Sequence, residues 1–239
     1  MRLLCTMITH NEADRYLQSC IKELQRYASY IYVVDDQSTD NTTEILRDLE
    51  VDYEIRPKTV PSFVEAEGLF RQYAWDKLVE RAYPWERDWI LSIDADEFPI
   101  GDLISTIETL EKFDASAANL KIHEIWSTDP IMKRVDGFWD TIKGVRLCRY
   151  QHGDQSFRSE GMGCGSVPRY GYQRALDNQF SFQLMHFGYA DIKDQELKYE
   201  FYSTKLDNGH NNQHIESIRK HGELICMPGH MPEVWRGIK

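Results

Sequence analysis

Three carboxylates stand within four positions at Asp94-Ala95-Asp96-Glu97, directly after the apolar run 89–93. Like charges this close repel one another, so placing them beside a buried strand costs free energy unless a cation joins them. A hard divalent ion that prefers oxygen ligands, magnesium or manganese, fits this set. Such an ion can bridge a diphosphate and neutralise the charge that develops as it leaves. The alternative is a solvated turn whose acids cap the next helix.

A second polar cluster, 35–41, follows the β-forming run 30–34. Asp36 can hydrogen-bond a base or a ribose from this turn while Asp40 caps the helix that comes next, and capping by the whole cluster is the alternative. Arg71 stands between apolar residues of a predicted helix. A partly buried arginine needs an anionic partner, which is either a ligand phosphate or a strand-end carboxylate.

The elements that must position these residues alternate between strands and helices. The patterns predict strands at 3–9, 30–34, 51–55 and 88–93, and helices at 12–27, 42–49, 64–81 and 101–113. This alternation predicts an α/β protein with a Rossmann-like, doubly wound and mostly parallel sheet. Ligands of such sheets bind at the carboxyl ends of the strands, where the clusters 9–12, 35–41 and 94–97 fall. The second half is less regular, with predicted strands at 118–125, 144–150 and 180–185, loops over 151–179 and a helix at 194–204.

Composition excludes several classes of protein. The 239 residues are 41% hydrophobic and 28% charged, as in ordinary globular domains, and the net charge of -11 disfavours nucleic acid as a partner. Five widely spaced cysteines without a CxxC indicate free thiols in a reducing compartment. We find no signal peptide and no run near the roughly 18 apolar residues of a membrane span, so we expect a cytoplasmic protein without a transmembrane segment.

Four segments, in this order, resemble glycosyltransferase family 2, whose enzymes have the GT-A fold. They are ITHNEADRYLQSCI, IYVVDDQSTDNTTEIL, FRQYAWDKL and WILSIDADEF. The last resembles the D-x-D strand of the family, and Gln72 stands where the family usually has asparagine. The resemblance implies a transferase that uses a nucleotide diphosphate sugar and a manganese or magnesium ion. It also implies that residues 1–100 form a nucleotide-sugar-binding half and residues 101–239 an irregular acceptor-binding half of one GT-A domain.

The resemblance implies a role for each matching residue. Asp36 would read the base, which in this family is commonly uracil, so the implied donor is a UDP-sugar. Thr9, Asn11 and Glu12 would line the nucleotide pocket. Arg71 and Asp94 would contact the diphosphate and ribose. Asp94 and Asp96 would bind the metal.

The second half is similar only in outline to a bacterial branch of the family that modifies surface saccharides. The matching pieces are Arg146-Leu147-Cys148-Arg149, Arg158-Ser159-Glu160 and Met185-His186-Phe187. By this mapping His186 is a further metal ligand, and the alternative is a hydrogen-bonded histidine at a strand end. Lys198 and Tyr202, four apart on a predicted helix, could close over the diphosphate, or they could be ordinary helix surface.

Members of this type usually invert the anomeric centre, so the hydroxyl of a saccharide or other acceptor attacks opposite the departing diphosphate. A carboxylate takes the proton of that hydroxyl, and Glu160 is our first candidate for this base and Asp154 the second. The metal and Arg71 would stabilise the leaving group.

Two other classes of function stay open. A sugar nucleotidyltransferase has a related sheet but needs a Gly-rich loop after the first strand, and here that loop, 9–12, lacks glycine. A non-catalytic nucleotide- or sugar-binding protein of the same fold is disfavoured by the intact Asp94 and Asp96, although the weak match of the second half leaves it open.

Overall fold

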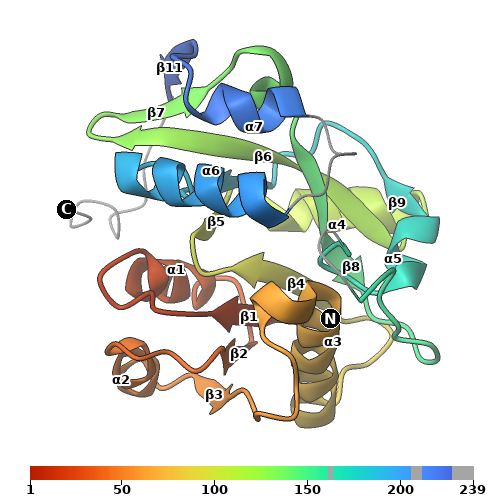
Figure 1. Cartoon of the computed structure of the whole chain (residues 1–239). Coiled ribbons are helices and arrows are strands. Elements are labelled where there is room, and N and C mark those ends of the chain that lie inside the picture. The colour runs from red at the N-terminus through yellow and green to blue at the C-terminus, as the bar shows by residue number, and fades with distance from the viewer. Residues whose placement is uncertain (161–163, 206–211, 228–239) are drawn as a thin grey trace.

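A computed structural model describes residues 1–160, 164–205 and 212–227 (Figure 1). Strands of the first hundred residues form the parallel part of the sheet. They are β1 (Leu3–Thr9), β2 (Tyr30–Asp35), β3 (Asp52–Ile55) and β4 (Trp89–Asp94). β1 lies between β2 and β4, with Thr9 opposite Asp35 and Ile8 opposite Asp94. The carboxyl ends of these three strands therefore meet at one edge of the sheet.

Helices cover both faces of this sheet because successive strand side chains point to opposite sides. Cys5 and Met7 face the side covered by α1 (Leu17–Leu24), α2 (Thr42–Asp48) and α4 (Leu103–Lys112). Leu4 faces the other side, where α3 (Phe63–Ala82) packs Trp75 and Leu78 against the strands. The α/β fold with a mostly parallel central sheet is confirmed.

The part of the sheet beyond β4 has mostly antiparallel pairs, with two strands that pair parallel to a neighbour. Its strands are β5 (Glu97–Ile100), β6 (Ala117–Thr128), β7 (Ile131–Arg134), β8 (Lys143–Arg149), β9 (Ala175–Leu176), β10 (Gln183–His186) and β11 (Leu224–Cys226). The strand order is β11-β7-β6-β8-β4-β1-β2-β3, and β10 pairs with β5 and β6 outside this path. In β10, His186 is opposite Glu97 of β5 and Glu124 of β6. This register brings residues of distant sequence segments to the end of β4.

The remaining helices are a short 3₁₀ helix (Gly137–Asp140), α5 (Arg169–Gln173), α6 (Ile192–Lys205) and α7 (Asn212–Ile218). In Figure 1, α6 lies in front of β6, between α7 and α1. A small aromatic cluster of Trp126, Trp139 and Tyr189 packs against side chains of α6. None of the helices within the described ranges is long and apolar enough to cross a membrane.

The first helix begins later than its apolar pattern predicts, at Leu17 instead of residue 12. The backbone N–H groups of Asn11 and Glu12 donate to the side chains of Ser38 and Thr42, each at 2.8 Å, and Asn11 has φ 52°. These contacts hold the segment against the end of β2 and off the helical path. The pattern also did not indicate β5, which forms only because β10 pairs with it.

Candidate active site

Asp36, the predicted reader of the base, is buried at the end of β2. Its Oδ1 accepts a hydrogen bond from Arg56 Nε, its Oδ2 accepts the Phe63 N–H at 3.0 Å, and its own N–H donates to the Thr9 carbonyl at 2.7 Å. Asp40 accepts the Thr42 N–H at 3.0 Å at the start of α2, but the N-cap position of this helix is Asn41. The turn is thus a fixed platform, and the role of Asp36 toward a base stays a prediction.

The other predicted pocket residues surround this turn. Asn11 Oδ1 accepts the Thr39 N–H at 2.8 Å. Thr9 Oγ1 and Glu12 Oε2 are buried and have no hydrogen-bond partner within the described part of the chain. Buried polar atoms without partners are rare in folded proteins, so these two atoms are candidates for contacts with a ligand or with water.

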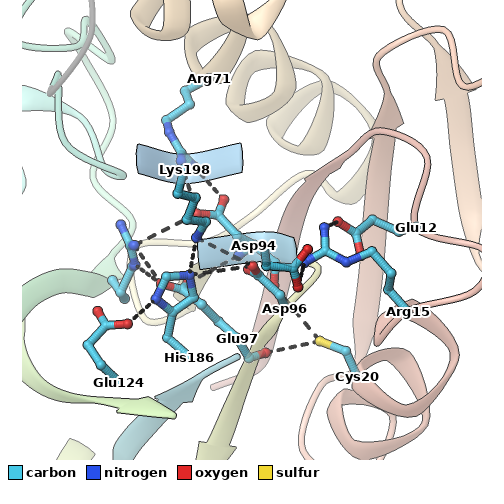
Figure 2. Close-up of polar contacts among 12 residues, drawn as sticks. Glu12, Arg15, Cys20, Arg71, Asp94, Asp96, Glu97, Glu124, His186 and Lys198 are labelled. Carbon is cyan, nitrogen blue, oxygen red and sulfur yellow. Dashed lines mark hydrogen bonds and ion pairs between the residues drawn. The ribbon is translucent and has the colours of Figure 1, made fainter. Parts of the chain in front are cut away.

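Asp94 ends β4, and an arginine binds both of its oxygens. Arg71 Nη1 and Nη2 donate to the two carboxylate oxygens at 2.9 and 3.1 Å (Figure 2). Arg71 Nε donates to Glu67 at 2.8 Å. Burial alone would raise the pKa of Asp94, but the positive charges of Arg71 and Arg146 outweigh it, and the pKa lies below its usual range. The anionic partners of Arg71 are therefore carboxylates of the protein.

Glu97, the third carboxylate of the cluster, is directed into the protein. Arg146 Nη2 donates to it at 2.6 Å, and its Oε2 accepts the Asp94 N–H at 3.1 Å. Burial raises the pKa of Glu97 in spite of Arg146. These contacts make Glu97 a residue that holds the end of β4 in place.

Asp96 faces a histidine and a lysine. His186 Nε2 is 3.4 Å and Lys198 Nζ is 3.9 Å from Asp96 Oδ2 (Figure 2). Burial alone would raise the pKa of Asp96, but these two neighbours hold it well below its usual range. Two segments more than eighty residues away in the sequence therefore meet at the D-x-D motif.

His186 is oriented from its other side by Glu124. Its Nδ1 lies 2.6 Å from Glu124 Oε2, and because a carboxylate only accepts, the proton of this hydrogen bond is on Nδ1. Burial alone would lower the pKa of His186, but Glu124 and Asp96 overcome this effect and raise the pKa to about 10. Nε2 is thereby directed at Asp96.

Glu12 lies on the far side of this centre, beside Arg15. Its Oε1 accepts from Arg15 Nη1 at 2.9 Å, and Arg15 Nη2 donates to Asp194 of α6 at 2.9 Å. Burial raises the pKa of Glu12 to about 8, although Arg15 opposes this shift. Arg15 therefore ties α6 to the loop that follows β1.

The two candidate bases lie in different surroundings. Asp154 is exposed and accepts the Ser156 N–H at 2.9 Å, and hydrogen bonds to Ser156 lower its pKa. The Glu160 side chain is exposed, while its carbonyl accepts the Gly68 N–H of α3 at 2.8 Å. Gly68 adjoins Glu67 in the sequence, so the backbone of Glu160 is held beside the Asp94 network. The segment after Asp154 is also held to α3, because the Gln155 carbonyl accepts a hydrogen bond from Gln72 at 3.1 Å.

Asp96 and His186 suit a divalent cation as a pair. Among the residues that the structure describes, no three Cys, His, Asp or Glu side chains are grouped to hold a metal ion. The separation of 3.4 Å between Asp96 Oδ2 and His186 Nε2 is close to that of neighbouring ligands about 2.1 Å from one ion. A carboxylate on the second nitrogen of the ring is usual for metal-binding histidines. Arg71 holds both oxygens of Asp94, whose metal role stays a prediction.

Sequence patterns missed several of the residues that complete this site. Glu124 was not singled out, and Arg146 stood in a matching segment without a role of its own. A charged residue that is buried in a strand needs a partner. The sequence therefore indicates that each residue has a partner but does not indicate which one. Glu124 pairs with His186 and Arg146 pairs with Glu97 through contacts between strands. Arg15 and Arg56 had no distinguishing pattern.

Sequence comparison places this site in a family. The pattern of the family described as Glycosyl transferase family 2 matches residues 5–167. This is more than half of the chain, so the chain belongs to glycosyl transferase family 2. Uncharacterized proteins of Mycobacterium tuberculosis and Mycobacterium bovis are each 33% identical over 102 residues. That match covers 40% of this chain and only 23% of either relative.

Solved structures are similar to this chain, and the likeness to the first of them supports the GT-A fold. A mannosyltransferase from Pyrobaculum calidifontis, in complex with GDP-Man and Mn²⁺, is 14% identical with a TM-score of 0.51 and covers 99% of this chain and 67% of its own. Glucosyl-3-phosphoglycerate synthase from Mycobacterium tuberculosis, in complex with Mn²⁺, UDP and glucosyl-3-phosphoglycerate, is 13% identical with a TM-score of 0.48. It covers 87% of this chain and 82% of its own.

Proposed function

We propose that the chain transfers a sugar from a nucleotide diphosphate sugar to a hydroxyl group of a saccharide or other acceptor, with inversion at the anomeric carbon. The observation that carries this proposal is the arrangement of Asp96, His186 and Glu124 at the carboxyl end of β4. Membership of glycosyl transferase family 2 supports the reaction class.

Asp96 and His186 would hold a manganese or magnesium ion. When bound, this ion supplies positive charge to the departing diphosphate. Glu124 keeps Nε2 of His186 turned toward Asp96, so that both ligand atoms are positioned before the ion arrives. The Mn²⁺ of the Pyrobaculum calidifontis complex supports a metal-dependent reaction.

The donor would bind along the edge formed by the ends of β1, β2 and β4. Asp36 is the proposed contact to the base, and uracil is the base that the family resemblance favours. The bidentate pair of Arg71 and Asp94 lies at the end of β4, where the diphosphate and ribose would pass. Because Arg71 is already neutralised by Asp94 and Glu67, we assign it the positioning of Asp94 as its main role.

Glu160 is the proposed base for the acceptor hydroxyl. It belongs to a segment that contacts α3 through Gly68, next to the network around Asp94. Its exposed carboxylate suits proton transfer from an acceptor that arrives from solvent. We also propose that the protein acts in the cytoplasm, which is supported by its free cysteines, four of which are buried.

The test is the release of UDP or GDP from a panel of UDP- and GDP-sugars, with and without Mn²⁺. We expect Mn²⁺-dependent release from one donor class. Asp96→Asn should abolish it, and Asp48→Asn, which removes the same charge from an exposed position of α2, should not. Glu160→Gln should lower turnover about a hundredfold, the usual contribution of a general base, and Asp154→Asn should have little effect. Tight binding of a nucleotide without turnover of any donor would favour the non-catalytic binding protein.

A further inference from the structure

Lys198 lies beside the two proposed metal ligands. It reaches from α6 to place its Nζ 3.2 Å from His186 Nε2 and 3.9 Å from Asp96 Oδ2. The same ammonium group is 4.6 Å from the centre of the Tyr189 ring, which stacks on Trp126. The side chain is three-quarters buried, with 25% of it exposed. The lysine is therefore held within the site and is not part of the exposed surface of α6.

Gly188 provides the space for this lysine. A Cβ atom at this position would lie 1.9 Å from Lys198 Nζ and 2.5 Å from His186 Nε2. The φ angle of Gly188 lies outside the left-handed region, so the backbone conformation does not require glycine there. The requirement comes from the approach of Lys198 to His186.

Lys198 lies close to any position that a divalent ion bound to Asp96 and His186 could take. The distances among Asp96 Oδ2, His186 Nε2 and Lys198 Nζ are 3.4, 3.2 and 3.9 Å. An ion about 2.1 Å from both ligand atoms must then lie within about 4.4 Å of the ammonium nitrogen, and as close as about 2 Å on the lysine side. The divalent ion and the ammonium group of Lys198 would repel each other strongly at these separations in a partly buried site.

We propose that Lys198 is a resident cation beside the metal site formed by Asp96 and His186, and that it moves away when metal and donor bind together. The donor supplies the reason for this exchange, because its diphosphate is the anion that could receive the displaced ammonium group. Without a donor, Lys198 opposes the ion and weakens metal binding. With a donor, the ion and the ammonium group both gain negative partners, so nucleotide and metal bind cooperatively. This inference rests on the proposed function of Asp96 and His186.

The test is a Mn²⁺ titration of the full chain, followed by the electron paramagnetic resonance signal of free Mn²⁺, without nucleotide and with saturating UDP or GDP. Lys198→Met removes the charge but keeps the length of the side chain. Lys193→Met is the matched control because Lys193 is an exposed lysine of the same helix. Melting temperatures establish that each variant is folded.

We expect Lys198→Met to bind Mn²⁺ without nucleotide at least tenfold more tightly than the wild type, and Lys193→Met to bind like the wild type. The factor by which the nucleotide tightens Mn²⁺ binding should be smaller in Lys198→Met. Adding Asp96→Asn to Lys198→Met should remove the gain.

Equal or weaker Mn²⁺ binding by Lys198→Met overturns the inference, even where nucleotide and metal still bind and the proposed function stands. A gain that survives Asp96→Asn also overturns it, because the metal would then bind elsewhere. Absence of Mn²⁺ binding in every variant, with nucleotide present, refutes the metal dependence in the proposed function and this inference with it.

Discussion

Replacing Arg71 by methionine should destabilise the protein strongly. Arg71 is only 6% exposed, and it neutralises Asp94 through two hydrogen bonds and Glu67 through a third. Removing one partner of a buried ion pair costs about 3–5 kcal/mol because a buried charge is left without compensation. Arg146 remains 3.8 Å from Asp94 and relieves part of this cost. We therefore expect a loss of about 3–4 kcal/mol in the free energy of unfolding.

The assay is urea unfolding at pH 7, followed by circular dichroism, with Arg47→Met as the control. Arg47 is an exposed arginine of α2, so its replacement should change the free energy of unfolding by less than about 0.5 kcal/mol. Adding Asp94→Asn to Arg71→Met should recover part of the loss, because it removes one of the two negative charges that Arg71 neutralises. A loss below about 1 kcal/mol in the free energy of unfolding of Arg71→Met would refute the reasoning. It would favour a ligand phosphate as the main partner of Arg71.

Three further predictions follow from other parts of the site. Glu124→Gln should weaken Mn²⁺ binding about 10- to 100-fold in the presence of nucleotide, because His186 loses its orienting carboxylate. The control Glu196→Gln, on the exposed face of α6, should bind Mn²⁺ like the wild type. Equal Mn²⁺ affinities of Glu124→Gln and the wild type would show that Glu124 is not part of the site. Burial raises the pKa of Glu12 from 4.5 to about 8, so between these values the folded protein holds a proton that the unfolded chain releases, and this group's contribution to stability falls as the pH rises. In Glu12→Gln that fall is absent. Between pH 5 and pH 8, the free energy of unfolding of the variant, measured with urea, should therefore rise by about 2–4 kcal/mol relative to that of the wild type. The same pH dependence of stability in both proteins would contradict the raised pKa. Gly68→Ala would place a Cβ 1.9 Å from the Ser159 carbonyl, so we expect a loss of about 1–3 kcal/mol in urea unfolding; unchanged stability would show that the 159–160 segment does not pack on α3.

The parallel part of the fold could be predicted because its information is local. The apolar run 3–9 and the run of β-forming residues 30–34 predicted strands that β1 and β2 confirm. The polar runs after them marked the edge where Thr9, Asp35 and Asp94 meet. The predicted start of α1 was wrong because Ser38, which follows β2, and Thr42, which begins α2, bind the backbone of residues 11 and 12 through their side chains. Helical periodicity cannot report such a contact.

The candidate site divides in the same way. Asp96 stands in a motif that is visible in the sequence, and His186 was found only through a weak resemblance. Glu124 could not be assigned, because its contact with His186 depends on the register between β6 and β10. Lys198 had two predicted roles, closure over a diphosphate or ordinary helix surface. It lies against His186 and Asp96, a position set by how α6 packs on the sheet, and its role toward a diphosphate stays a prediction.

The central claim, that Asp96 helps to hold a metal and a nucleotide diphosphate, is tested most directly by thermal unfolding. The wild type, Asp96→Asn and the control Asp48→Asn would be melted with UDP, GDP or CDP, each with and without Mn²⁺. A nucleotide at about a hundred times its dissociation constant adds about 2.7 kcal/mol, or roughly 5–10 °C for a chain of this size. We predict such a shift for one nucleotide, dependent on Mn²⁺, lost in Asp96→Asn and kept in Asp48→Asn. A shift of equal size in Asp96→Asn, or none with any nucleotide, would contradict the account.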